Sequence, residues 1–172
     1  MTSDDRLWFE QQIGEMQKAL YNVAYCIVKN SSDAEDAVCD ALLSAWQDFP
    51  KLHDRSYFRA WLMKILKFRS YDILRRNRKY AEYDDRLLNY SRNDAVDDLE
   101  VIESAERERS VRNAISQLPD EQRLCVTLFY MEDYSIKEIS KIMQCTEGTT
   151  KSRLSRAREK LKKLLEGGEY DA

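Results

Sequence analysis

The stretch Ser135–Leu165, SIKEISKIMQCTEGTTKSRLSRAREKLKKLL, decides the fold of the C-terminal part of the chain. Ser135 and Glu138 have the spacing of a capping box, so a short helix is expected to begin here. The three residues 144–146 then form a turn that leads into a longer, basic helix. A short helix, a tight turn and a longer basic helix are the parts of a helix-turn-helix, whose second helix enters the major groove of DNA with its N-terminal end first.

The second of these helices has two distinct faces. At about 100° per residue, its apolar side chains and one threonine share a narrow arc. We expect this arc in the core: Thr150, Leu154, Ala157, Leu161 and Leu165. The opposite arc carries small donors and one guanidinium that can reach base edges. These candidates for base readout are Thr149, Ser152, Ser155 and Arg156. Lys151 and Arg153, at the margins, are expected to meet phosphates. The alternative is a solvated basic helix that only packs its leucines.

Composition and periodicity favour an all-α fold. The chain has only 4 Gly and 2 Pro, and no segment alternates as a strand would. Apolar spacing predicts a first helix that ends near Asn30. A capping pattern at Ser32 and Glu35 opens a second helix, which Pro50 closes. A third is capped by Ser56 and runs to about residue 78. The C-terminal part is predicted to hold four helices: one ending at 118, and three over 119–130, 135–143 and 146–165.

Charge is strongly segregated along the chain. The net charge is −3, but residues 64–79 hold seven Lys or Arg against one acid, and 147–163 hold seven against two. Residues 81–107 carry nine acids against three bases and lose the helical period. Two compact basic helices can bind a phosphate backbone whatever the net charge, because salt screens beyond about 10 Å. We predict two small helical domains, 1–80 and 106–172, joined by a flexible acidic linker, 81–105.

The second predicted helix presents an acidic face around an aliphatic side chain. Opposite its alanine-rich apolar side, Asp36, Asp40 and Gln47 surround Leu43. An exposed leucine ringed by acids suits a basic helical partner. The alternative is an ordinary solvated acidic face.

The third predicted helix has an apolar arc and a basic strip. The expected core residues are Phe58, Trp61, Leu62, Ile65 and Phe68. The strip, rotated by about 120° from them, consists of Lys64, Lys67, Tyr71, Arg75 and Arg78. Cations around an aromatic ring suit a DNA backbone beside unstacked bases. Asp72 falls within the apolar arc and is therefore expected to take an ionic or hydrogen-bonded partner.

Several classes of function find no support in the sequence. The cysteines, Cys26, Cys39, Cys125 and Cys145, show no CxxC pair, so neither a zinc site nor a disulfide framework is indicated. There is no phosphate loop or nucleophile and base set, and lone His53 is expected to be a solvated loop residue. We therefore expect no catalytic residue, no metal and no cofactor. The acidic N-terminus and the broken apolar runs predict a cytoplasmic protein without membrane insertion.

The same residues resemble a known family. Ser135–Leu165 looks like region 4 of the bacterial sigma factors, and AISQLPDEQRLCVTLFYMEDYS before it matches the start of that region at Leu118, Pro119 and Arg123. DAEDAVCDALLSAWQDF and YFRAWLMKILKFRSYDILRR resemble region 2 of the same family. With no further domains, the chain is identified as similar to the extracytoplasmic-function (ECF) group. It departs from the usual pattern at four positions: Cys39, Leu66, Phe68 and Thr150.

The resemblance implies a set of partners. Region 2 would dock on the clamp helices of the largest subunit of core RNA polymerase through Asp36, Asp40, Leu43 and Trp46. The loop before the third helix would capture a base flipped from the minus-ten element, and Lys64, Lys67, Tyr71 and Arg75 would follow the DNA. The loop candidates are His53, Arg55 and Tyr57, with Lys51 and Asp54 beside them. Region 4 would read the minus-thirty-five element and contact the second-largest subunit. The family also implies an anti-sigma factor.

Two other classes compete with this interpretation. A helix-turn-helix regulator with a helical sensing or dimerising domain would bind duplex DNA without polymerase. An enzyme with an attached DNA-binding module is disfavoured by the missing catalytic motifs. Promoter-specific transcription that requires core polymerase would distinguish a sigma factor from both.

Overall fold

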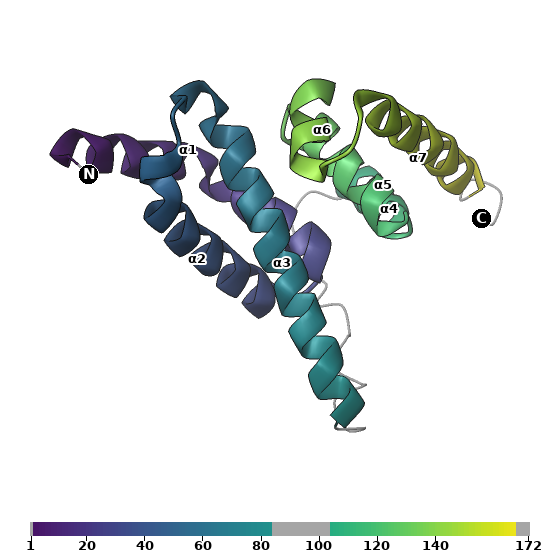
Figure 1. Ribbon diagram of the computed structural model, residues 1–172. Coiled ribbons are helices and arrows are strands. Elements are labelled where there is room, and N and C mark those ends of the chain that lie inside the picture. The colour runs from purple at the N-terminus through teal and green to yellow at the C-terminus, as the bar shows by residue number, and fades with distance from the viewer. Residues whose placement is uncertain (1, 84–103, 168–172) are drawn as a thin grey trace. The chain divides into compact units, whose positions relative to one another are not determined.

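The computed structural model describes residues 2–83 and 104–167 and consists there of helices, without strands, as the all-α prediction requires (Figure 1). The chain divides into two compact units, Met1–Asp94 and Ala95–Ala172. The predicted linker, 81–105, lies almost entirely outside the described residues. At its edges, the third helix continues to Tyr83 and the next helix begins at Ser104.

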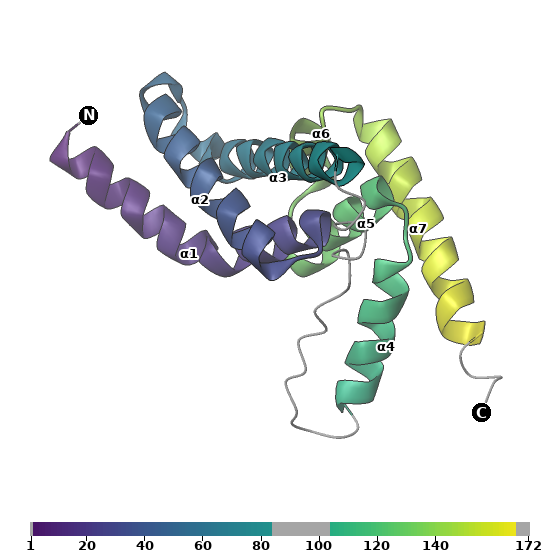
Figure 2. The same ribbon diagram turned by 90° about the horizontal axis from the view of Figure 1, so that it is seen from below.

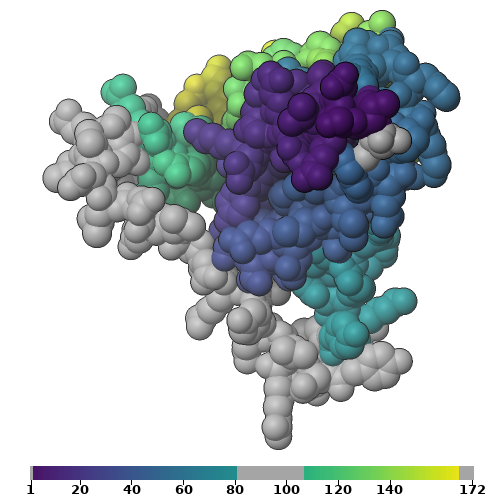
Figure 3. Space-filling view, turned by 90° about the vertical axis from the view of Figure 1, so that its left-hand side faces the viewer, coloured from purple at the N-terminus to yellow at the C-terminus, as the bar shows by residue number. Residues whose placement is uncertain are grey.

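The N-terminal unit is a bundle of three helices. These are α1 (Ser3–Val28), α2 (Ser31–Asp48) and α3 (Phe58–Tyr83), and each packs against the other two. Two short 3₁₀ turns, η1 (Phe49–Lys51) and η2 (Arg55–Tyr57), lie between α2 and α3. Figure 3 shows the face of this unit that α1 and α2 cover.

The caps of α2 and of the turn before α3 differ from the prediction. Asn30, not Ser32, caps α2: its backbone is extended, and its Oδ1 accepts from the Asp33 N–H at 2.9 Å. Asp54, not Ser56, caps η2, because its Oδ1 accepts from the Ser56 N–H at 2.9 Å. The sequence pattern was ambiguous because several cap-forming residues stand side by side in both segments.

Small side chains bring α2 close to its neighbours. Ala34, Ala37, Ala41 and Ala45 are all fully buried. On the other side of the core, α1 contributes Phe9 and Leu20 among its buried residues. An aromatic cluster closes the end of the bundle near the loop, with Phe9, Phe49 and Phe58 in edge-to-face contacts.

The apolar arc of α3 is rotated from the predicted one. Its buried members are Leu62, Met63, Leu66, Ser70 and Ile73, together with Phe58 and Ala60. Of the predicted core residues, Phe58 and Leu62 are fully buried, Trp61 and Ile65 are only half-buried, and Phe68 is 42% exposed, so the prediction of Phe68 as a core residue was wrong. The polar Ser70 made this arc hard to recognise in the sequence. Ser70 can be buried because its hydroxyl donates to the Leu66 carbonyl at 2.9 Å and is satisfied within the helix.

The C-terminal unit contains the predicted helix-turn-helix. Its elements are α4 (Ser104–Ser116), α5 (Asp120–Val126), the π-helical η4 (Thr127–Met131), α6 (Ile136–Met143) and α7 (Glu147–Gly167). The capping box of Ser135 and Glu138 is confirmed, and Gln144 takes the left-handed conformation that turns the chain toward α7. Figure 2 shows α7 as the long final helix of the unit. It packs on α4, α5 and α6.

The predicted core arc of α7 is confirmed at its first three positions. Thr150 and Ala157 are fully buried and Leu154 is 3% exposed, whereas Leu161 and Leu165 are half-buried. The hydroxyl of Thr150 is satisfied inside the core, since it donates to the Thr146 carbonyl at 3.3 Å. A threonine is therefore accommodated at this position without an unpaired polar group.

Candidate nucleic-acid interface

The start of α7 is fixed by a threonine cap. The Thr149 N–H donates to Thr146 Oγ1 at 3.1 Å, and the two hydroxyl oxygens lie 3.0 Å apart. Beyond this cap, Lys151, Ser155 and Arg156 are exposed, whereas Thr149 and Ser152 are half-buried. The predicted readout residues thus share one side of the helix, opposite the buried Leu154. The exposed donors and the guanidinium can form hydrogen bonds with the major groove.

Arg153 is more buried than Lys151 and Arg156 and contacts other parts of the unit. Its guanidinium pairs with Glu121 of α5, its Nη1 lies 3.6 Å from Cys145 Sγ, and its side chain is 19% exposed. Arg153 therefore fastens α7 to α5 within the unit. Sequence reasoning missed Glu121, because no local pattern pairs two residues that far apart.

Cys125 lies beside this cluster at the centre of the unit. The residue is fully buried, and burial raises the pKa of its thiol from 9.0 to about 11. Attraction to Arg153 acts in the opposite direction but is outweighed. The buried thiol is therefore protonated at neutral pH and serves as an apolar core residue.

The acidic face of α2 is exposed in the N-terminal unit. Asp36 and Asp40 lie on the surface, and Leu43 between them and Gln47 is 58% exposed. Trp46 differs, because it is half-buried and its ring makes an edge-to-face contact with Phe9, with centroids 5.1 Å apart. Its indole is shared between the aromatic core and the surface.

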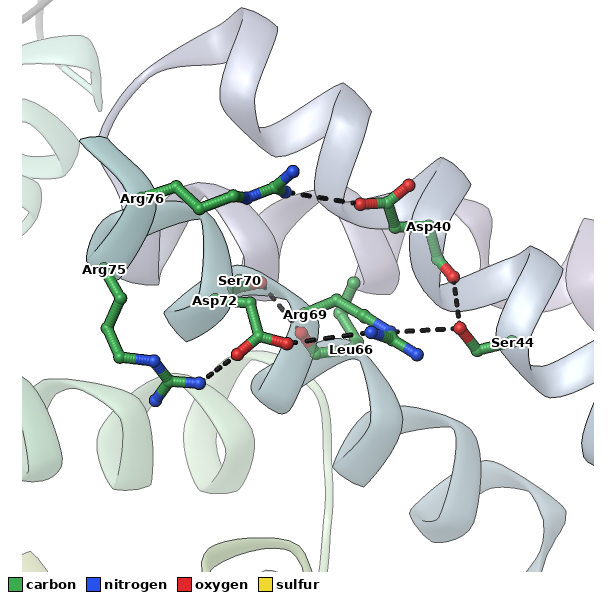
Figure 4. Close-up of polar contacts among 8 residues, drawn as sticks. All are labelled: Asp40, Ser44, Leu66, Arg69, Ser70, Asp72, Arg75 and Arg76. Carbon is green, nitrogen blue, oxygen red and sulfur yellow. Dashed lines mark hydrogen bonds and ion pairs between the residues drawn. The ribbon is translucent and has the colours of Figure 1, made fainter. Parts of the chain in front are cut away.

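A polar network joins this acidic face to α3 (Figure 4). Asp40 Oδ2 lies 3.6 Å from Arg76, and the Asp40 carbonyl accepts from Ser44 Oγ at 2.7 Å. Arg69 Nε donates to the same Ser44 hydroxyl at 3.0 Å. The network thus ties one helix that carries acids to another that carries bases.

The same network continues along α3 and lines a shallow pocket. Asp72 pairs with Arg75 and lies 3.7 Å from Arg69, so the expected ionic partner of Asp72 is confirmed, although Asp72 is not in the core. The pocket has a volume of about 340 Å³. It is lined by four cations and two acids: Asp40, Arg69, Asp72, Arg75, Arg76 and Lys79. This excess of positive charge favours an anion such as a phosphate.

The predicted basic strip of α3 contains an unpredicted aromatic residue. Arg75 and Arg78 are exposed, Lys64 and Tyr71 are half-buried, and Lys67 is buried. Phe68 lies between them on the helix surface, and Lys67 Nζ is 5.1 Å from the centroid of its ring. The sequence signal for this exposure was the cationic neighbours of Phe68 at helical spacing, Lys64 and Arg75.

The three predicted base-capture residues of the loop between α2 and α3 differ in their contacts. His53 is exposed, and Tyr57 is 46% exposed. Arg55 instead pairs with Asp5 of α1 and lies over the ring of Trp8. His53 and Tyr57 thus lie exposed on the loop, whereas Arg55 contacts α1.

Membrane spans and metal clusters are both absent from the described residues. Within them, no helix combines the length and the hydropathy of a membrane span, and no cluster of three metal-ligating side chains occurs. The four cysteines form no disulfide.

Comparisons with known proteins find two matching family models and several relatives. Residues 13–80 match the model of "Sigma-70 region 2", and residues 108–161 match that of "Sigma-70, region 4". The chain is 30% identical over 161 residues to the ECF RNA polymerase sigma factor SigM of Mycobacterium tuberculosis, covering 94% of this chain and 79% of that protein. It is 28% identical over 170 residues to the RNA polymerase sigma-H factor of Pseudomonas aeruginosa, covering 94% and 88%.

A solved structure of a sigma factor is similar to this chain. The sigma factor RpoE of Bartonella quintana, solved in complex with the anti-sigma factor NepR, aligns with a TM-score of 0.77 at 27% identity, covering 95% of this chain and 98% of that one. This similarity covers both units, and so do the similarities to the two relatives. The chain therefore belongs to the ECF family of RNA polymerase sigma factors.

Proposed function

We propose that the N-terminal unit binds core RNA polymerase and the minus-ten element while the C-terminal unit reads the minus-thirty-five element. The observation that carries this proposal is the presence of two basic helical surfaces, on α3 and α7, together with an acidic one on α2. One polymerase-bound chain can then contact two promoter elements.

The acidic face of α2 is the proposed contact with the clamp helices of the largest polymerase subunit. Asp36, Asp40 and Leu43 are exposed side by side on one helix, which supports docking against a basic helix. Trp46 contributes the edge of its half-buried ring. Region 4 is proposed to contact the second-largest subunit as well.

Promoter DNA is proposed to lie along the strip of α3 and against the N-terminal half of α7. On α3, the cations around Tyr71 and Phe68 suit a backbone next to unpaired bases. On α7, Ser155 and Arg156 are placed for base edges and Lys151 for a phosphate. Thr149 and Ser152 are half-buried and can add hydrogen bonds only at close approach.

The regulation of the chain and its cellular location are proposed from its family membership. An anti-sigma factor is an expected partner, since the related sigma factor RpoE from Bartonella quintana was solved in complex with one. The chain is proposed to act in the cytoplasm, by binding and not by catalysis.

The test is run-off transcription with purified bacterial core polymerase and genomic fragments. Specific transcripts that require both the core enzyme and this chain are the expected result. Specific binding to duplex DNA without any dependence on core polymerase would contradict the proposal and favour a helix-turn-helix regulator. A variant with Asp40→Arg should lose transcripts, whereas Glu10→Gln on α1 should keep them.

A further inference from the structure

The first turn of α1 is fastened to the loop between α2 and α3. Asp5 Oδ2 accepts from the Thr2 N–H at 2.9 Å, while Asp5 Oδ1 pairs with Arg55, fifty residues further along the chain. Hydrogen bonds from Thr2, and then the attraction of Arg55, lower the pKa of Asp5. The carboxylate is therefore charged at neutral pH and is held from both sides.

Aromatic rings hold the same guanidinium from a second direction. The Arg55 guanidinium carbon lies 4.8 Å from the centroid of Trp8 and 5.7 Å from that of Phe49. Trp8 in turn contacts Phe58, the first residue of α3, with centroids 5.0 Å apart and planes at 74°. Arg55 thus connects the loop to α1 and, through Trp8, to the start of α3.

The Arg55 side chain keeps 48% of its surface exposed, but its Nη2 is paired with Asp5. A phosphate would therefore have to compete with that carboxylate for the guanidinium. Its neighbours His53 and Tyr57 are exposed and flank it on the loop. Fixing Arg55 restricts the backbone from which these two side chains project.

We propose that Arg55 is a positioning residue, which together with Asp5 and Trp8 clamps the loop 52–57 in the conformation that captures an unpaired promoter base. The proposal rests on the function proposed above and gives α1, to which the sequence assigned no role in DNA binding, a part in promoter opening. Arg55 thereby moves from the set of predicted DNA contacts to the residues that support them.

The experiment uses the full chain assembled with core polymerase. The non-template strand of the minus-ten element carries 2-aminopurine at the base to be flipped, and its fluorescence reports capture. Asp5→Asn and Arg55→Gln are compared with Glu10→Gln, a control that alters the exposed pair of Glu10 with Arg6 on the same helix. Each variant is also titrated with salt to obtain the slope of promoter binding.

The clamp predicts the same loss from both of its ends. Asp5→Asn and Arg55→Gln should each lower base capture roughly three- to tenfold, because a displaced loop misplaces the captured base. The salt slope should stay unchanged for both, and Glu10→Gln should match the wild type. Asp5→Asn removes a negative charge, so simple electrostatics would strengthen DNA binding; a weaker capture would point to the loop.

Other results would overturn the clamp. If Arg55→Gln reduces the salt slope by roughly 0.7 to 0.9, the loss of about one phosphate contact, while Asp5→Asn has no effect, then Arg55 contacts DNA. Thr2→Ala removes the cap hydroxyl but leaves the Asp5 and Arg55 pair in place, so an equal loss in that variant would assign the effect to the helix cap. If the wild-type chain gives no core-dependent capture, the proposed function fails with it.

Discussion

Asp40 on α2 and Arg76 on α3 form an ion pair, with a carboxylate oxygen 3.6 Å from a guanidinium nitrogen. The pair joins the proposed polymerase surface to the basic half of α3. Both side chains are at least half exposed, at 50% and 60%, so solvent screens the attraction and the pair contributes at most about 1 kcal/mol to folding.

Asp40→Arg is therefore expected to weaken binding to core polymerase much more than it lowers the free energy of unfolding. The expected loss of affinity is roughly tenfold or more, because the reversal places like charges in a proposed contact. Binding is measured with labelled chain and core enzyme, and stability by urea denaturation. Arg76→Gln breaks the same ion pair from the other side; if it weakens core binding equally, the internal pair and not the polymerase contact explains the effect.

Arg156→Glu should weaken promoter binding by the holoenzyme through the minus-thirty-five element. Loss of a base contact costs about 1 to 3 kcal/mol, and the reversed charge adds repulsion. Lys162→Glu is the matched control, since Lys162 lies further along α7, 3.7 Å from Glu166. Equal losses in the two variants, measured by gel shift on promoters with and without the element, would indicate general charge attraction only.

Phe68→Ala should impair promoter melting while leaving the fold intact. The ring is 42% exposed, so its removal should lower the free energy of unfolding by about 1 kcal/mol or less. Loss of a stacking surface costs about 1 to 3 kcal/mol per base, which permanganate footprinting of the open complex can detect. Phe68→Tyr keeps the ring and should retain melting. Leu62→Ala, at a fully buried position, should instead destabilise the unit by about 2 to 5 kcal/mol.

The stability of the chain should fall in alkaline solution in part through Cys125. Burial raises the pKa of this thiol from 9.0 to about 11, so the native state keeps a proton that the unfolded chain releases. The contribution is fully present below pH 9 and is lost as the pH rises toward 11, amounting to at most about 3 kcal/mol. Urea denaturation at several pH values should show a smaller alkaline loss for Cys125→Ala than for the wild type. Cys39→Ala, at an exposed position, should not alter the profile; an unchanged profile in Cys125→Ala would contradict the assignment.

Asn30→Ala should destabilise the N-terminal unit, whereas Ser32→Ala should not. Asn30 Oδ1 accepts the Asp33 N–H at 2.9 Å, and removing such a cap costs about 1 kcal/mol. Ser32 is exposed and lies inside the helix, so its replacement should stay within about 0.5 kcal/mol. Chemical denaturation of both variants distinguishes the two caps. The reverse order of effects would restore Ser32 as the cap.

Local patterns in the sequence determined the helices, the helix-turn-helix and the separation of charge. The capping box of Ser135 and Glu138 and the core positions Leu154 and Ala157 could be predicted because they depend on residues within a few turns of each other. The acidic face around Leu43 followed in the same way from the helical period. These features need no knowledge of the neighbouring helices.

Only the tertiary structure decided which side of α3 is buried and which cations pair with acids of another helix in the same unit. Phe68 was predicted in the core but lies on the surface, whereas Ser70, outside the predicted arc, is buried. A hydroxyl satisfied within its own helix can be buried, and an aromatic ring can stay on the surface. The pairs of Arg55 with Asp5 and of Arg153 with Glu121 join residues far apart in sequence. Helical spacing contains no information about such contacts, since they arise only when separate helices pack together.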